Sequence, residues 1–114
     1  MDNSKNDLYF ARKIHNDILF IIEHSKDLSE EELGKDEVLL DSIMFRFIQI
    51  SESIKRLSNE FKIQNNQIPW ISITGLRNKI VHEYGKIDLT IIYKTVKHDI
   101  INIETLFSNI LNKI

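Results

Sequence analysis

The sequence predicts an all-α fold: an up-and-down bundle of four or five helices, built by a single domain over residues 1–114. One proline and three glycines in 114 residues leave few places at which a helix must break. Apolar residues recur at spacings of three and four along most of the chain, as on the buried face of a helix. No segment has the alternating pattern of a β-strand. A chain of this length has room for one domain with its own core.

The first helix is expected to end where the polar stretch 25–29 begins. Ser29 and Glu32 have the spacing of a capping box, so a short helical turn should start there and close at Gly34. The apolar ladder of the first helix consists of Leu8, Ala11, Ile14, Ile18, Ile21 and Ile22.

The second helix is expected to be the longest. It should begin near Glu37 and continue for about seven turns as far as Phe61. Spacings of four and three alternate along its apolar seam, which keeps the seam on one side of the helix. The seam consists of Ile43, Phe47, Ile50, Ile54, Leu57 and Phe61.

A second apolar patch lies on the far side of the same helix, about 100° to 200° from the seam. Met44, Phe45 and Ile48 form this patch, and Glu52 lies among them. Two interpretations stay open at this point. The helix is either buried on both sides within its own bundle, or it presents this side to a second subunit.

The third helix should follow the loop 65–67, because Pro69 suits a first helical turn, and it should stop at Gly85. Asp88 is a good N-cap for a fourth helix. The apolar stripe of that helix consists of Leu89, Ile92, Val96, Ile100, Ile103, Phe107, Ile110 and Ile114.

The composition restricts the classes of function that the chain can have. A formal net charge of −2 argues against a general nucleic-acid coat protein, but not against an enzyme that touches RNA at one small pocket. The chain has no cysteine, no signal-peptide pattern and no apolar stretch of membrane-spanning length, which together favour the cytoplasm. No glycine-rich phosphate loop occurs, and His15, His24 and His98 form no metal-ligand pair and are expected at the surface. We therefore expect no cofactor and no metal.

Residues 77–84 concentrate groups that can act on a phosphodiester. Arg77 offers a planar guanidinium that keeps its charge, and His82 offers an imidazole that can exchange a proton near neutral pH. Asn78 and Tyr84 add an amide and a phenol. Such a set could cleave RNA without a metal, with the cation stabilising the charge that develops on phosphate.

Spacing alone does not assemble this site. Arg77 and His82 are five residues apart and point about 140° away from each other on a regular helix, whereas Asn78 and His82 share a face. Three alternatives remain: the last turn loosens, Arg77 curls round the helix, or two subunits complete the site. The plainer interpretation is a solvated arginine and a histidine near a helix end.

The motif Arg77-x-x-x-x-His82-x-Tyr84 resembles that of HepT-like proteins in the HEPN group. The flanking segments also resemble the family pattern, which makes the match more specific than the bare motif, and the resemblance extends from about Leu8 to Ile103. These flanking features are Pro69-Trp70, Gly75-Leu76, Asp88 with Tyr93, Arg46, and the stretch from Glu52 to Leu57.

The resemblance implies a HEPN-like, dimeric fold and a metal-independent endoribonuclease, the toxin of a type VII-like toxin–antitoxin pair. It implies catalytic roles for Arg77 and His82, with Asn78, Arg46 and Glu52 in support. Its partners would be RNA, a second copy of the chain and an MntA-type nucleotidyltransferase antitoxin, which uses ATP to AMPylate the motif tyrosine, here Tyr84. The alternative is a non-catalytic accessory or substrate-binding subunit of a minimal nucleotidyltransferase, and a plain helical dimer is a third possibility.

Four positions depart from the family pattern, and one of them is Gly85, which follows Tyr84 where many relatives have an aromatic residue. Glu83 stands where many relatives have glycine, and an acidic side chain there disfavours a nearby phosphate and would raise the pKa of His82. Ser51 and Ser53 stand on either side of Glu52 in place of the usual glycine and alanine. None of these departures removes a motif residue.

Overall fold

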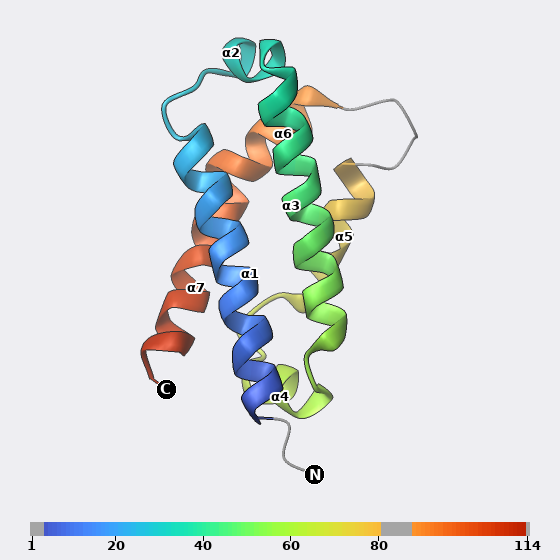
Figure 1. The fold of residues 1–114 in the computed structure, drawn as a ribbon, viewed down its shortest axis with the longest axis vertical. Coiled ribbons are helices and arrows are strands. Elements are labelled where there is room, and N and C mark those ends of the chain that lie inside the picture. The colour runs from blue at the N-terminus through green and yellow to red at the C-terminus, as the bar shows by residue number, and fades with distance from the viewer. Residues whose placement is uncertain (1–3, 81–87, 114) are drawn as a thin grey trace.

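The computed structural model describes residues 4–80 and 88–113, and over these ranges the chain is helical and contains no β-strand. The all-α prediction is therefore confirmed. Four long helical runs alternate in direction, and short helices close the two ends of the bundle (Figure 1). The elements are α1 (Ser4–Ser25), α2 (Glu30–Lys35), α3 (Glu37–Arg56), α4 (Asn59–Gln64), α5 (Trp70–Ile80), α6 (Leu89–Lys94), the π-helical turn η1 (Thr95–Asp99) and α7 (Ile100–Asn112).

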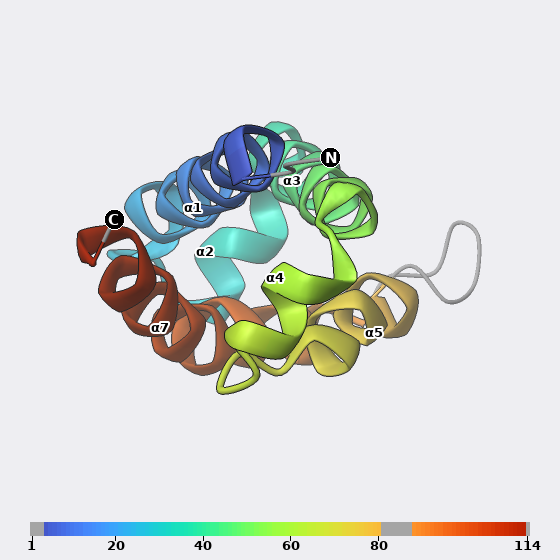
Figure 2. The same cartoon turned by 90° about the horizontal axis from the view of Figure 1, so that it is seen from below.

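The long helices form two layers. Seen along the bundle, α1 and α3 lie on one side, and α5 and α7 lie on the other (Figure 2). Helix α1 packs against α3 and α7, and α3 also packs against α5. The apolar seams predicted for the first, second and fourth helices meet between the layers. The largest fully buried side chains of these seams are Ile14, Ile18, Ile21, Ile43, Ile50, Ile92, Val96, Ile100 and Phe107.

Helix α2 begins with the predicted capping box. The backbone N–H of Glu32 donates to Ser29 Oγ, and the backbone N–H of Ser29 donates to Glu32 Oε1, both at 3.1 Å. Hydrogen bonding of the Glu32 carboxylate to the backbone N–H of Ser29 and to its hydroxyl lowers the pKa of Glu32. Gly34 lies inside α2 and does not close it, because the helix continues to Lys35.

The predicted seven-turn helix is wrong in length: α3 ends at Arg56, and α4 is a separate helix. Asp7 of α1 causes the break, because its carboxylate accepts the backbone N–H of Ser58 at 2.7 Å and the Ser58 hydroxyl at 2.6 Å. A continuous helix would need that N–H for its own ladder. Ser58 instead caps α4, and Phe61 still packs against the core, as its place in the apolar seam predicted.

The fourth predicted helix starts at its predicted cap but is not a uniform α-helix. The backbone N–H of Ile91 donates to Asp88 Oδ1 at 3.2 Å, and a π-helical turn follows at Thr95–Asp99. Within this turn, Lys97 Nζ donates to the backbone oxygens of Ser25 and Lys26 at 2.7 and 2.8 Å. The π turn thereby supplies donors to the C-terminal end of α1, whose carbonyls have no partner within their own helix.

The second apolar patch of α3 is partly buried in the bundle and partly exposed, so each of the two interpretations fits a part of it. Met44 is buried in the core and Ile48 is half-buried, whereas the side chain of Phe45 is 56% exposed. His24 and His98 are exposed as expected, but His15 is not a simple surface residue, because it contacts Glu104 of α7 at 2.9 Å. No described helix is long and apolar enough to cross a membrane.

Candidate active site

Helix α5 carries the first half of the motif and is held by its N-terminal turn. Trp70 Nε1 donates to the backbone oxygen of Lys62 at 3.1 Å, and the Trp70 ring meets Phe107 of α7 edge-on at 5.7 Å. Ile73, one turn from the start of the helix, is 4% exposed and anchors α5 in the core. These contacts fix the direction of α5, and so the place at which its last turn presents Arg77.

Arg77 lies half-buried in that last turn, next to an exposed Asn78. Its Nη1 donates to Asn78 Oδ1 at 3.0 Å. The guanidinium therefore turns toward the side of the helix that Asn78 occupies. His82 and Tyr84 lie outside the described residues, as do Glu83 and the expected helix end at Gly85.

A guanidinium has five N–H donors, and the bond to Asn78 occupies one of them. Asn78 is neutral, so it orients the guanidinium without cancelling its charge. An arginine held in this way keeps donors for a phosphate oxygen.

Arg46 is placed differently. Its Nη1 donates to Asp17 Oδ1 of α1 at 2.8 Å, and its guanidinium lies 3.9 Å from the centre of the Phe20 ring. Lys13 Nζ approaches the other oxygen of the buried Asp17 at 3.7 Å. Arg46 thus joins α3 to α1, and no hydrogen bond in the described part of the chain joins it to α5.

Glu52 lies on the exposed side of α3. Its side chain is 60% exposed and pairs at 3.3 Å with Lys55, one turn further along the helix. An exposed pair of this kind is weak, so the Glu52 carboxylate stays available to another group. The neighbouring Ser51 and Ser53 are both buried.

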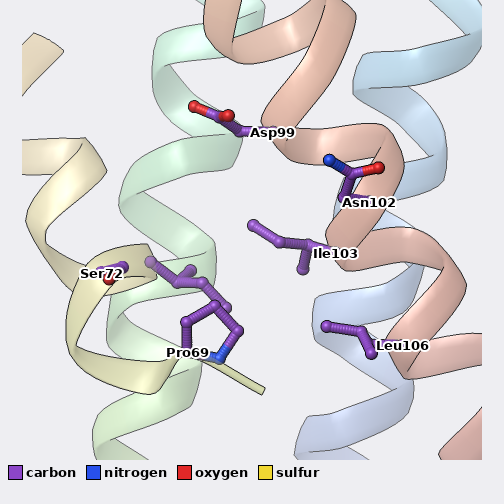
Figure 3. Close-up of a pocket in the computed structure, with 7 residues that line it drawn as sticks. Pro69, Ser72, Asp99, Asn102, Ile103 and Leu106 are labelled. Carbon is purple, nitrogen blue, oxygen red and sulfur yellow. The ribbon is translucent and has the colours of Figure 1, made fainter. Parts of the chain in front are cut away.

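Sequence reasoning did not predict a groove of about 320 Å³ on the other flank of α5, facing α7. Figure 3 shows Pro69 and Ser72 on one side of it and Asp99, Asn102, Ile103 and Leu106 on the other. Asp99 supplies the one charge among the lining residues, and a carboxylate disfavours a phosphate ligand. The groove therefore does not extend the Arg77 site. No group of metal-ligating side chains occurs in the described ranges.

The geometry defines a class of protein: an all-α bundle that carries an arginine and an amide at the end of one helix. Comparison with known families identifies the particular family. The family model of HepT-like ribonucleases matches residues 14–110, so the chain belongs to this family.

Individual relatives agree with this assignment. A protein of Thermococcus cleftensis named "Probable ribonuclease HepT" is 31% identical over 107 residues, which cover 87% of this chain and 97% of the relative. Among the further relatives named as putative RNases are the following two. One, from Caldanaerobacter subterraneus subsp. tengcongensis, is 35% identical and covers 82% of this chain and 84% of its own length. The other, from Methanocaldococcus jannaschii, is 29% identical, and the match covers 70% of this chain and 73% of the relative. No solved structure gives a significant match.

Proposed function

We propose that the chain is a metal-independent endoribonuclease whose reaction is carried by Arg77 and His82. The observation that supports this most directly is the Arg77 guanidinium, oriented by the neutral Asn78 amide at the end of α5. Membership of the HepT-like family, together with the complete motif in the sequence, supports the choice of RNA as substrate.

In the proposed reaction, the ribose 2′-oxygen attacks the neighbouring phosphorus while its proton passes to a base. The bond from phosphorus to the 5′-oxygen breaks, and that oxygen takes up a proton as it leaves. His82 exchanges one of these protons, and Arg77 donates hydrogen bonds to the non-bridging oxygens as their charge increases. The products are a 2′,3′-cyclic phosphate and a 5′-hydroxyl.

Arg46 and Glu52 support the reaction from a distance in this proposal. Arg46 holds α3 against α1, and α3 in turn packs against α5. Glu52 offers an exposed carboxylate on α3, the helix that packs against α5. Both are therefore positioning residues.

Regulation is also part of the proposal. An MntA-type nucleotidyltransferase antitoxin transfers AMP from ATP to the Tyr84 phenol, forming a phosphodiester and releasing pyrophosphate. The added phosphate brings negative charge beside Arg77 and His82, and it competes with RNA for the same cation. The chain acts in the cytoplasm as one single-domain protein and as a homodimer.

The deciding experiment incubates the purified chain with RNA in the presence of a metal chelator and compares wild type with His82→Ala. We expect cleavage with cyclic-phosphate ends for wild type, and at least a hundredfold slower cleavage for the variant. Co-expression with the nucleotidyltransferase should raise the mass of the peptide containing Tyr84 by whole AMP units, and Tyr84→Phe should abolish this increase.

Equal cleavage by wild type and His82→Ala would refute the catalytic assignment. Absence of cleavage in both, combined with stimulation of the nucleotidyltransferase, would identify the chain as the accessory subunit.

A further inference from the structure

The groove between α5 and α7 has room for a small organic molecule. Its volume of about 320 Å³ lies at the lower end of the range for small-molecule sites, roughly 300 to 1,000 Å³. Two buried side chains line it, Ile73 of α5 and Ile103 of α7, and Pro69 and Leu106 add further apolar surface. An apolar group that enters the groove leaves water and gains these contacts.

The remaining lining residues supply oxygen acceptors. Asp99 and Asn102 are one helical turn apart and lie toward one end of the groove, while Ser72 lies across from them on α5 (Figure 3). A carboxylate, an amide and a hydroxyl can each accept a hydrogen bond, and a primary ammonium group has three N–H donors. The polar end of the groove therefore has the composition of a site for a cation.

The Asp99 carboxylate is not used to cap a helix, unlike two other aspartates of the chain. Asp36 and Asp88 each accept a backbone N–H at the start of a helix, at 3.0 and 3.2 Å. Asp99 precedes α7, but the chain continues into α7 directly from the π turn η1, and the exposed Asp99 side chain makes no cap hydrogen bond. Within the described ranges it takes part in no ion pair either. Its carboxylate is available to a ligand.

We propose that this groove binds a small organic cation, a primary amine that carries an aromatic or branched aliphatic group. The ammonium group donates hydrogen bonds to Asp99, Asn102 and Ser72. The apolar group lies against Ile73 and Ile103. This site is separate from Arg77 and does not depend on the proposed nuclease.

Charge and length distinguish an amine from other occupants. The Asp99 carboxylate repels anionic ligands, and a neutral ligand would leave it without a counter-charge beside apolar surface. A partner helix that docks in a groove uses side chains at positions i, i+4 and i+7, which extend over roughly 10 Å. The lining of α5 covers only Pro69–Ile73, about one turn or roughly 6 Å. A small molecule fits this length.

A bound amine would connect two helices. Helix α5 packs mainly against α3, and the groove separates part of it from α7. A ligand that contacts both walls binds the folded chain and not the unfolded one, so it raises the melting temperature by mass action. Thermal unfolding therefore provides a readout of binding that needs no RNA.

The first experiment compares 2-phenylethylammonium with two molecules of similar shape, the neutral 2-phenylethanol and the anion 3-phenylpropanoate. Each is titrated into the purified chain, and the methyl groups are followed by NMR. We expect saturable shifts at Ile73, Ile103 and Leu106, and a dissociation constant for the ammonium roughly fivefold or more below that of the alcohol. The proposal is overturned if the alcohol or the anion binds as tightly as the ammonium, or if no molecule gives saturable shifts.

Asp99→Asn provides the second test, because it keeps the shape of the side chain and removes its charge. It should reduce the preference for the ammonium over the alcohol to less than about twofold. Asp41→Asn is the matched control, since Asp41 is also exposed and lines a second pocket of about 270 Å³ with Phe20 and Phe45. The control should keep the wild-type preference. Loss of the preference in Asp41→Asn, with none in Asp99→Asn, places the amine in the second pocket and overturns the proposal.

Ser72→Trp closes the groove from α5. Ser72 is exposed, so thermal unfolding should show a folded variant. We expect at least tenfold weaker binding of 2-phenylethylammonium and no rise in melting temperature when it is added. Unchanged binding overturns the proposal. So does a wild-type chain that binds none of the three molecules, while Ser72→Trp loses binding to the nucleotidyltransferase, because the groove is then a protein contact.

Discussion

Arg46 and Arg77 show how the same side chain is used for two purposes in one small bundle. The Arg46 guanidinium lies between a buried carboxylate and an aromatic ring, so its charge is neutralised and its position is fixed by α1. The Arg77 guanidinium is bonded to a neutral amide and keeps its charge. Both residues belong to stretches that resemble the same family, but the surroundings of Arg46 make it part of the scaffold, whereas those of Arg77 suit a reaction.

The largest expected effect is on Arg77. Arg77→Ala should slow RNA cleavage at least a hundredfold, because the developing phosphate charge loses its cation, while the free energy of unfolding changes by less than about 0.5 kcal/mol. Arg77→Lys keeps the charge but loses the planar fork, so its rate should fall between those of wild type and Arg77→Ala. Single-turnover cleavage and denaturant unfolding measure the two quantities. A stable Arg77→Ala chain with wild-type cleavage would contradict the catalytic role.

Arg46→Ala should give the opposite pattern. Loss of the guanidinium leaves the buried Asp17 carboxylate without its main partner, which should cost about 2 kcal/mol of unfolding free energy, reduced from the fully buried case because Arg46 is half-buried. Cleavage per folded molecule should fall much less than it does for Arg77→Ala, because Arg46 supports the reaction only through the placement of α3. The matched control is Asp17→Asn with Arg46→Ala, which removes the unpaired charge and should regain part of the loss. If the loss of unfolding free energy in the double variant equals the sum of the losses in the two single variants, Arg46 and Asp17 are not coupled.

The two glycines extend the comparison from charge to packing. Gly75→Ala should raise the unfolding free energy of the monomer by about 0.5 to 1 kcal/mol, because alanine favours the helix and meets no neighbour. Gly34→Ala should gain less, since Leu89 has to move away from the new methyl group. Urea unfolding at a concentration that keeps the chain monomeric measures both. A larger gain at Gly34 would show that its contact with Leu89 does not constrain α2.

The smallest expected effect concerns the helix cap. Ser29→Ala removes the hydroxyl that helps to lower the pKa of Glu32, so that pKa should rise toward its ordinary value. A carboxylate with a lowered pKa in the folded state stabilises the fold above its unfolded pKa and loses that contribution as the pH falls through the folded pKa. When the pH is lowered, the Ser29→Ala variant should therefore lose less unfolding free energy than wild type. An NMR titration of the Glu32 carboxyl group checks the shift, with Glu31 as the control.

Local patterns predicted most of the helices well. The first helix, the capping box at Ser29 and the N-cap at Asp88 depend on neighbouring residues, and all three are present in the structure. The break at Ser58 could not be predicted, because the apolar seam continues through it to Phe61 and the group that ends α3 is Asp7, which lies 51 residues away in the chain. The π turn at Thr95–Asp99 also escapes the pattern, since the apolar stripe fits an ordinary α-helix equally well.

For the candidate site, the chemistry was visible in the sequence and the geometry was not. Types and spacing identified Arg77 and Asn78, but only the structure shows that the amide receives the guanidinium, and only the structure assigns Arg46 to α1. The assignment of His82 and Tyr84 still rests on the sequence motif.

The sequence by itself determined that the chain folds into helices, which of their faces are buried and which residue types are available for chemistry, because helix period and side-chain type are local properties. The tertiary structure alone decided where α3 ends, which arginine is neutralised and which glycine meets a neighbour. Each of these depends on a hydrogen bond, an ion pair or a packing contact between segments that are distant in the chain, and such contacts exist only after the helices have come together.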